Sequence, residues 1–170
     1  HGWGATVNQP DLVDVYLLDI DPEDDNRYRV DGEWLELEAF DIPIRVSLWG
    51  WLPWTVRERG YRSIHGPVMK TNHGTYAVRY AGMDEIRQVE QWLAMSAATS
   101  FSEWQAAIAL QHIASFNFVY ANADGDIHFI HNAMMPERAE GWRWDQYLPG
   151  DRSDLIWQRY LSITELPSVT

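Results

Sequence analysis

The most concentrated apolar residues lie in two short runs, residues 116–121 and 126–131, on either side of Asn122-Ala123-Asp124-Gly125. Asp-Gly between two such runs is a strong hairpin signal, because Gly accepts a positive φ and Asp tolerates one. Both faces of the first run are apolar, with Phe118 on one face and Val119 on the other. A strand of this kind is normally covered on both faces. The pattern therefore predicts a β-hairpin at the centre of a layered domain.

The first eighty residues show the alternation that is typical of short strands, interrupted by turn residues. Asp31-Gly32 predicts a two-residue hairpin turn. The acidic residues 21–26 predict a solvated loop. Strands are predicted at residues 15–18, 27–30, 33–37, 43–49, 54–59 and 75–80.

The period then changes from that of a strand to that of a helix. Ile86, Val89 and Leu93 recur at helical spacing, which predicts a helix near residues 84–96. Ser100 and Glu103 form a capping-box pattern that opens a second helix, over residues 100–113. The second helix is apolar around much of its circumference, so we expect it to be largely buried. Many strands and two helices predict an α+β fold.

Composition and charge narrow the classes of function. A length of 170 residues suits one domain, and no internal repeat or linker divides the chain. The net charge of −12 argues against nucleic-acid or anionic-membrane partners, which attract basic surfaces. No apolar run reaches the ~18 residues of a membrane span. The absence of Cys excludes disulfides and thiolate chemistry. Because the chain begins at His1 without an initiator Met or a signal peptide, we expect it to be a piece of something longer.

Three groups of residues could carry chemistry. Asp11 and Asp14, with the carbonyl of Val13 between them, offer hard oxygen ligands that suit Ca²⁺, although spaced acids before a strand are more often simply solvated. The sequence from Asn122 superficially resembles a Ca²⁺ loop, but its twelfth position is Ala133 instead of Glu, so turn chemistry explains it better. The six His are best explained as hydrogen-bonded structural imidazoles. No nucleophile elbow, phosphate loop, zinc-helix motif or dinucleotide fingerprint is present.

The order of several short motifs resembles one family, the penicillin amidases and acyl-homoserine-lactone acylases, which are N-terminal-nucleophile hydrolases. The motifs keep their order and approximate spacing across essentially all 170 residues. They are Trp3-Gly4-Ala5-Thr6, Asp11-x-Val13-Asp14, His65-Gly66-Pro67, Trp92, Phe101-Ser102-Glu103-Trp104, Phe116-Asn117-Phe118-Val119-Tyr120-Ala121, Asp124-Gly125-Asp126-Ile127, Pro136-Glu137-Arg138 and Leu148-Pro149-Gly150-Asp151.

The resemblance implies a fragment of a four-layer αββα sandwich, taken from the middle of the long chain of such an enzyme. In that family the long chain begins with a Ser whose hydroxyl attacks an amide carbonyl, with its own α-amine as the base. A backbone N–H and an Asn amide form the oxyanion hole. The resemblance places that N–H at Val7, the nucleophile upstream of His1 and the Asn beyond Thr170. We therefore expect this chain alone to be inactive.

The resemblance also assigns binding residues. It implies a structural Ca²⁺ held in part by Asp11, the Val13 carbonyl and Asp14, and an acyl-group pocket lined by Ala5, Trp92 and Phe116. For Trp92 and Phe116, a plain core position is an equally good interpretation. The implied partners are an N-acyl substrate and the short chain of the same precursor, in the periplasm or outside the cell.

The acyl preference stays open. Thr6-Val7-Asn8 is more similar to the lactone-acylase branch, whereas Asp11-x-x-Asp14 is more similar to the penicillin amidase branch. Both a penicillin-type side chain and an acyl-homoserine lactone therefore remain candidate substrates. Two other classes of function also remain: a Ca²⁺-stabilised, Trp-rich carbohydrate-binding module, which exposed Trp side chains on one face would favour, and an interaction domain with no site.

Overall fold

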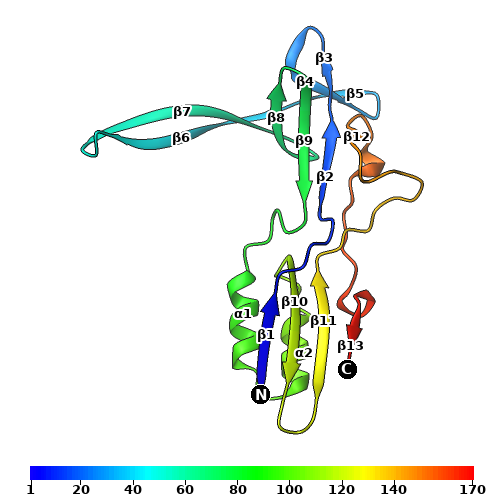
Figure 1. Ribbon diagram of the computed structural model, residues 1–170. Helices are drawn as coiled ribbons and strands as arrows, with labels where there is room; N and C mark the ends of the chain where they lie inside the picture. Colours follow the sequence, from blue (N-terminus) through cyan, green and yellow to red (C-terminus); the bar gives the residue numbers. More distant parts are fainter. The chain divides into compact units, whose positions relative to one another are not determined.

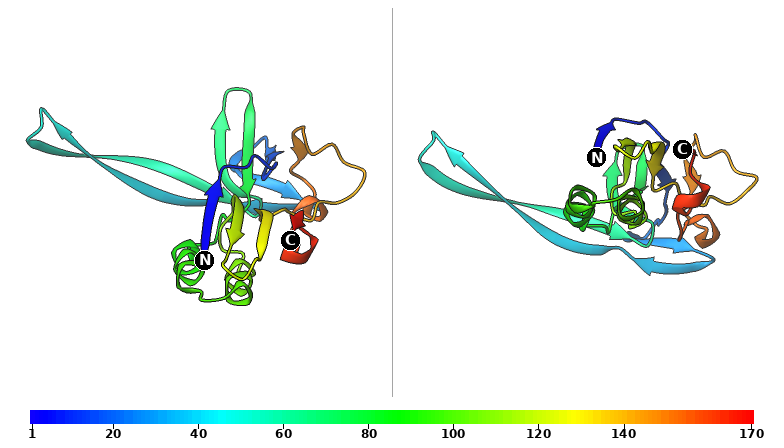
Figure 2. Two further views of the ribbon diagram at one scale, coloured as in Figure 1. Left: turned by 60° about the horizontal axis from the view of Figure 1, so that its bottom comes forward. Right: turned by 90° about the horizontal axis from the view of Figure 1, so that it is seen from below.

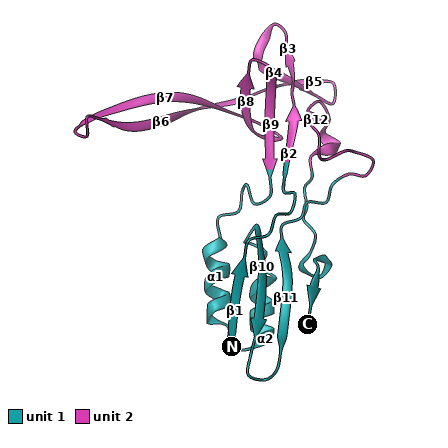
Figure 3. Cartoon of the chain, in the orientation of Figure 1, with its two compact units in different colours: residues 1–13, 80–138, 157–170 teal, residues 14–79, 139–156 magenta.

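The computed structural model describes residues 1–170, which divide into two compact units. Unit 1 comprises residues 1–13, 80–138 and 157–170, and unit 2 comprises residues 14–79 and 139–156 (Figure 3). The chain passes between the units several times, so no linker marks the division in the sequence. No helix combines the length and the apolar character that a membrane crossing requires. Each unit is described by itself.

Unit 1 is built on a four-stranded sheet in the order β1-β10-β11-β13. The predicted hairpin is confirmed as β10 and β11, which pair antiparallel with Phe118 opposite Ile130. Gly125 in the turn has a φ of 100°, a conformation that favours glycine. Strand β1 pairs with the other edge of β10. The strands of unit 1 are β1 (Gly2–Thr6), β10 (Ser115–Ala121), β11 (Ile127–Ala133) and β13 (Ser168–Val169).

Two helices, α1 (Gln88–Ala97) and α2 (Phe101–Ile108), lie side by side on one face of the strands β1, β10 and β11 (Figures 1 and 2). The predicted cap at Ser100 is confirmed, because its hydroxyl accepts a hydrogen bond from the Glu103 N–H at 3.3 Å. The core lies between helices and sheet. It contains Met95, Ala98, Trp104, Ala107, Ile108, Ile113, Phe118, Tyr120, Ile130 and Leu166.

The positions of the two helices are confirmed, but the faces expected to be buried are partly wrong. In α1 the buried side chains are Gln91 and Met95, while the apolar stripe that predicted the helix is solvent-exposed, with Ile86 at 90%. Helix α2 ends at Ile108 instead of residue 113, and Ala106 and Ala109 are exposed. The sheet of unit 1 is likewise covered by helices on one face only. Val119 and Phe129, on its other face, are exposed.

Unit 2 contains two sheets. The larger has the order β12-β2-β9-β8-β7-β6, and the smaller has the order β3-β4-β5. Their strands are β2 (Val13–Leu17), β3 (Asp19–Asp21), β4 (Asp24–Val30), β5 (Glu33–Glu36), β6 (Glu38–Leu48), β7 (Leu52–Ser63), β8 (Gly66–Thr71), β9 (Gly74–Tyr80) and β12 (Leu148–Pro149). The core of unit 2 contains Tyr16, Leu18, Tyr28, Val30, Leu37, Ala77, Leu148 and Leu155.

Two details of unit 2 test local predictions. The Asp31-Gly32 turn is confirmed, with φ angles of 52° and 88° at its two residues. Residues 22–26 are exposed as predicted, but the prediction of a loop is wrong, because β3 and β4 pair across this segment. The acidic side chains there stabilise the tight connection: Asp21 accepts from the Glu23 N–H at 3.0 Å and pairs with Arg27 at 3.2 Å.

Strands β6 and β7 are much longer than predicted and form a two-stranded arm beyond β8 (Figure 1). Pro43 and Pro53 interrupt the sequence pattern, but Pro43 lies on the outermost strand of the sheet, where a missing N–H is tolerated. One face of the arm is almost wholly apolar and exposed, and three Trp gather toward its tip. The exposed apolar residues of the arm are Phe40, Ile42, Ile44, Val46, Leu48, Trp49, Trp51, Trp54 and Val56.

Candidate functional site

Val7 lies at the end of β1, immediately after the last rung of the ladder, where Thr6 pairs with Asn117. The residue is 76% exposed. The Asn117 amide donates to the Val7 carbonyl at 3.4 Å and to the Thr6 hydroxyl at 3.3 Å. His131 Nδ1 is 2.9 Å from the Asn117 carbonyl oxygen. Because that oxygen can only accept, the imidazole carries a proton on Nδ1 in this arrangement.

The side chain of Asn8 fixes the segment that follows β1. Its Nδ2 donates to the main-chain carbonyl of Asn132 at 2.9 Å. Its Oδ1 accepts a short hydrogen bond from the hydroxyl of Ser115. Asn8 is thus tied to the start of β10 and the end of β11 at once. Asn8 was not among the site residues predicted from the sequence.

Three residues assigned to the acyl pocket meet on the helix side of the sheet. Ala5 lies opposite Phe118 in the ladder, so its side chain shares the face that carries Phe116 and Phe118. Trp92, from α1, contacts Phe116 edge-on, with ring centroids 5.8 Å apart. Trp3 packs against Trp92 at 5.3 Å. The expected contact between Trp92 and Phe116 is present, and their role in binding an acyl group stays a prediction.

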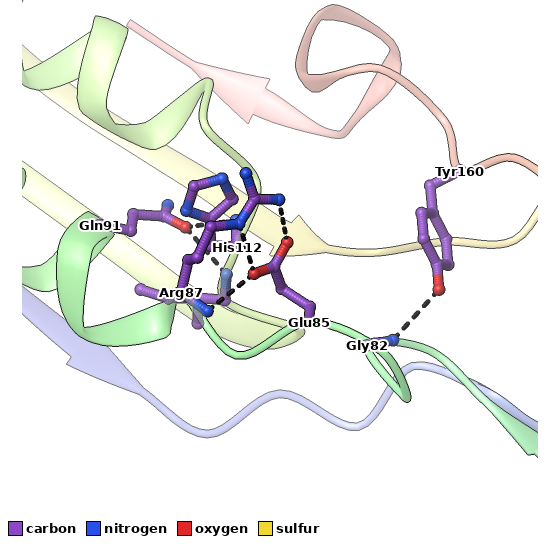
Figure 4. Close-up of polar contacts among 7 residues, drawn as sticks. Gly82, Glu85, Arg87, Gln91, His112 and Tyr160 are labelled. Atoms are coloured by element: carbon purple, nitrogen blue, oxygen red, sulfur yellow. Dashed lines mark hydrogen bonds and ion pairs between the residues drawn. The ribbon is translucent and has the colours of Figure 1, made fainter.

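Gln91 anchors α1 to the connection between α2 and β10. It is fully buried, and its Oε1 accepts from the N–H groups of His112 and Ile113 at 2.7 and 2.8 Å (Figure 4). Its Nε2 donates to the Ile108 carbonyl at 3.3 Å. These bonds satisfy main-chain groups that no regular ladder reaches. No signal in the sequence predicted this role, because the apolar stripe of Ile86, Val89 and Leu93 places Gln91 on the opposite side of the helix.

Two polar contacts hold the segment before α1: an ion pair between Glu85 and Arg87, and a hydrogen bond to the Tyr160 hydroxyl. Hydrogen bonding to the Arg87 guanidinium lowers the pKa of the Glu85 carboxyl from its usual 4.5 to about 2 (Figure 4). The Tyr160 hydroxyl accepts from the Gly82 N–H at 3.1 Å. Both contacts fix the approach to α1, and through it Trp92.

A separate apolar hollow of about 580 Å³ opens along the sheet of unit 1. It contains none of Ala5, Trp92 and Phe116, so it is distinct from the predicted acyl pocket. Its lining comes from β1, the β10–β11 hairpin and the end of the chain, and includes Gly4, Val119, His128, Phe129 and Val169.

The residues predicted to hold Ca²⁺ fit that ion only in part. Arg138 Nη1 lies 3.2 Å from Asp11 Oδ2, so a guanidinium already occupies one oxygen of this carboxylate. Asp14 is buried, while Val13 is half exposed at the start of β2. Nowhere in the chain do three or more Asp, Glu, His or Cys side chains gather as a metal-binding group. The calcium assignment therefore stays a prediction, and no chemical step is derived from it.

His65, from the His65-Gly66-Pro67 motif, is a buried imidazole in unit 2. Its ring packs on Tyr16, with centroids 4.6 Å apart, and edge-on to Tyr28 at 6.4 Å. Burial and the nearby Arg79 lower its pKa from 6.5 to about 4. A buried imidazole between aromatic rings fits the structural role expected from the sequence, but the expected hydrogen bonds are absent, because neither ring nitrogen has a partner.

The fold is a strand-rich α+β arrangement in which helices cover one face of an antiparallel sheet. An exposed residue lies at the end of one strand, and an aromatic pair lies on the helix side. The sequence model of the penicillin amidase family matches residues 1–170. The chain belongs to that family.

Comparison with known proteins agrees with this assignment. The chain is 25% identical to penicillin G acylase of Escherichia coli over 91% of its own length and 20% of the relative's. It is 26% identical to the acyl-homoserine lactone acylase PvdQ of Pseudomonas fluorescens over 79% of its length and 18% of the relative's. The thermostable penicillin G acylase from Alcaligenes faecalis shares its fold, with a TM-score of 0.83 at 24% identity over 98% of this chain and 30% of that one. The chain thus spans about a fifth of the length of the curated relatives.

Proposed function

We propose that this chain is part of a longer amidohydrolase that cleaves the amide bond of N-acyl compounds. The observation that carries the proposal is the contact between Trp92 and Phe116 on the sheet face shared by Ala5, with the exposed residue Val7 at the end of the same strand. An apolar aromatic surface near the main-chain N–H of an exposed residue suits an acyl chain whose carbonyl must be polarised.

In the proposed reaction, a Ser at the start of the long chain attacks the amide carbonyl, and its α-amine takes up the hydroxyl proton. The Val7 N–H donates to the oxyanion that forms on the carbonyl oxygen, together with an Asn amide from another part of the protein. The C–N bond then breaks, and the amine leaves with the proton. Water hydrolyses the remaining acyl ester and regenerates the Ser. This chain supplies the N–H and part of the acyl pocket.

The proposal extends to a structural Ca²⁺ held weakly by Asp11, the Val13 carbonyl and Asp14, with further ligands from other parts of the longer protein. It also includes the short chain of the same precursor as a partner and a periplasmic or secreted location. All three rest on the family resemblance.

The test is chromophore release from an aryl-acetyl anilide and a fatty-acyl anilide. The longer protein should hydrolyse at least one of them, and the preferred substrate would identify the acyl group. The 170-residue chain alone should release nothing above a blank, because the members of a catalytic unit act non-additively. Turnover by the chain alone that survives purification would contradict the assignment of the nucleophile to another segment.

The carbohydrate-binding alternative has one observation in its favour: Trp49, Trp51 and Trp54 are exposed near the tip of the β6–β7 arm. Titration with a panel of oligosaccharides, followed by Trp fluorescence, tests it directly. A saturable change that disappears in a Trp49→Ala, Trp51→Ala variant would support that function.

A further inference from the structure

The geometry points to a network of side-chain amides, Asn8, Asn132 and Gln91, that holds the Val7 peptide in register with the Trp92–Phe116 pair. The inference rests on the proposed function, because it takes Val7 as the oxyanion donor and the aromatic pair as part of the acyl pocket. Its three members are positioning residues: they act through their neighbours and touch no substrate.

The first link joins Asn8 to the two central strands. The segment after β1 has left the ladder, so its main chain no longer has strand partners. The Asn8 side chain replaces them, accepting from the Ser115 hydroxyl and donating to the Asn132 carbonyl at 2.9 Å. Because Asn8 directly follows Val7, these two bonds hold the Val7–Asn8 peptide in place. They thereby limit rotation about the Val7 Cα, and so the orientation of the preceding Thr6–Val7 peptide, which carries the Val7 N–H.

The second link runs from Asn132 to α1. The Asn132 side chain is almost fully buried, and its Nδ2 donates to the Ile113 carbonyl at 3.0 Å. The N–H of the same Ile113 donates to Gln91 Oε1 at 2.8 Å. Gln91 immediately precedes Trp92 in α1. The register of the hairpin also places Asn132 opposite Phe116. The network therefore ends at both members of the aromatic pair.

This connection matters because an oxyanion donor works only over a narrow range of distance, about 2.7–3.1 Å from the developing charge. A misplacement of about 1 Å can reduce a rate about 100-fold. The aromatic pair fixes where the acyl group lies, and Val7 must meet the carbonyl at its end. Buried amides suit this task, because a shifted geometry leaves buried polar groups without hydrogen-bond partners, which is unfavourable.

The kinetic test uses the longer protein. Asn8→Ala and Ser115→Ala should each lower kcat by up to about 100-fold and change KM far less, because Gln91 still anchors α1 and Trp92 therefore moves only slightly. The double variant should be no slower than Asn8→Ala, since both changes remove one shared bond. Ser115→Thr, which keeps the hydroxyl, should retain most of the rate.

Asn122 provides the matched control. Its side chain makes three hydrogen bonds, accepting from the N–H groups of Asp124 and Asp126 and donating to the Asp126 carboxylate, but it lies at the other end of the hairpin. Asn122→Ala should leave kcat unchanged. Equal losses in kcat for Asn8→Ala and Asn122→Ala, or additive losses in the Asn8→Ala, Ser115→Ala double variant, would overturn the inference.

A second measurement does not depend on activity. In the 170-residue chain, amide NMR signals of Ile113 and the Trp92 indole should shift in Asn8→Ala and stay in place in Asn122→Ala. If the longer protein hydrolyses no acyl amide while these shifts appear, the proposed function fails and the network stands. If the shifts stay within residues 7–9, the network is overturned, whatever the activity.

Discussion

Protonation of His65 should control how the stability of the chain depends on pH. The imidazole is 0% exposed, and neither ring nitrogen has a hydrogen-bond partner. Tyr16 and Tyr28 pack against it, Arg79 raises the cost of a second positive charge, and Asp31 partly offsets that cost. The folded state therefore holds the ring neutral, with a pKa lowered from 6.5 to about 4.

The size of the effect follows from linkage. Between pH 6.5 and 4, the unfolded chain takes up a proton at this residue and the folded chain does not, so the free energy of unfolding falls as the pH falls. The shift of His65 from 6.5 to about 4, at about 1.4 kcal/mol per pH unit, corresponds to a loss of about 3 kcal/mol. The full contribution is present above pH 6.5. Below pH 4 both states are protonated, and the loss from His65 ends.

The assay is urea unfolding of the wild-type chain and of His65→Phe at half-unit steps from pH 4.5 to 7.5. The wild type should lose about 2 kcal/mol more than the variant between pH 6.5 and 5. His65→Gln serves as a second variant if the larger Phe does not fit, and His73→Gln, which changes an exposed histidine, is the control. Parallel pH profiles for the wild type and both His65 variants would refute the argument, because they would mean that the ring is not held neutral.

Three further predictions concern other parts of the chain. Trp104 is fully buried and packs on Tyr120, with ring centroids 4.9 Å apart. Trp104→Ala should therefore lower the free energy of unfolding by about 3–5 kcal/mol, whereas Leu110→Ala, at an exposed position, should lower it little. Equal losses for the two variants in chemical unfolding would contradict this. Gly150→Ala should lower the melting temperature more than Gly60→Ala. A Cβ at Gly150 would lie 2.7 Å from the Leu17 carbonyl oxygen, while one at Gly60 would meet the movable ring of Phe40. A larger loss for Gly60→Ala would show that β12 can shift. Ca²⁺ should raise the melting temperature only at millimolar concentration, because ligand near its Kd adds only about 0.4 kcal/mol. The rise should be absent with Mg²⁺ and in the Asp11→Ala, Asp14→Ala variant; equal shifts in these three measurements would remove the calcium assignment.

Local signals in the sequence predicted the elements of the fold well where a few adjacent residues determine the backbone. The Asp-Gly turns at Asp31 and Asp124 and the cap at Ser100 are of this kind, because each depends on the φ preference or hydrogen bonding of one or two residues. The resemblance added the family and the α+β fold. Neither required knowledge of distant contacts.

Periodicity was less informative about which side chains this chain buries. The spacing of Ile86, Val89 and Leu93 correctly predicted α1, but the helix packs through Gln91 and Met95 instead. The long arm was missed because Pro43 and Gly60 divide its pattern. In the structure Pro43 lies on an edge strand, and Gly60 leaves room for the ring of Phe40 across the ladder. A periodic pattern identifies side chains that a fold can bury, and tertiary packing decides which of them it does bury.

The candidate site shows the same division between local and distant information. Val7, Trp92 and Phe116 came from family motifs, each readable within a few residues. Asn8 and Gln91 did not, because their partners are 107 positions away at Ser115 and 22 positions away at Ile113. Only the strand register, with Thr6 opposite Asn117 and Phe116 opposite Asn132, brings these amides together. A site whose reacting groups are recognisable in the sequence can thus depend on positioning groups that become recognisable only once the strands are paired. For this reason the Asn8 and Ser115 variants test the part of the proposed site that family motifs alone do not predict.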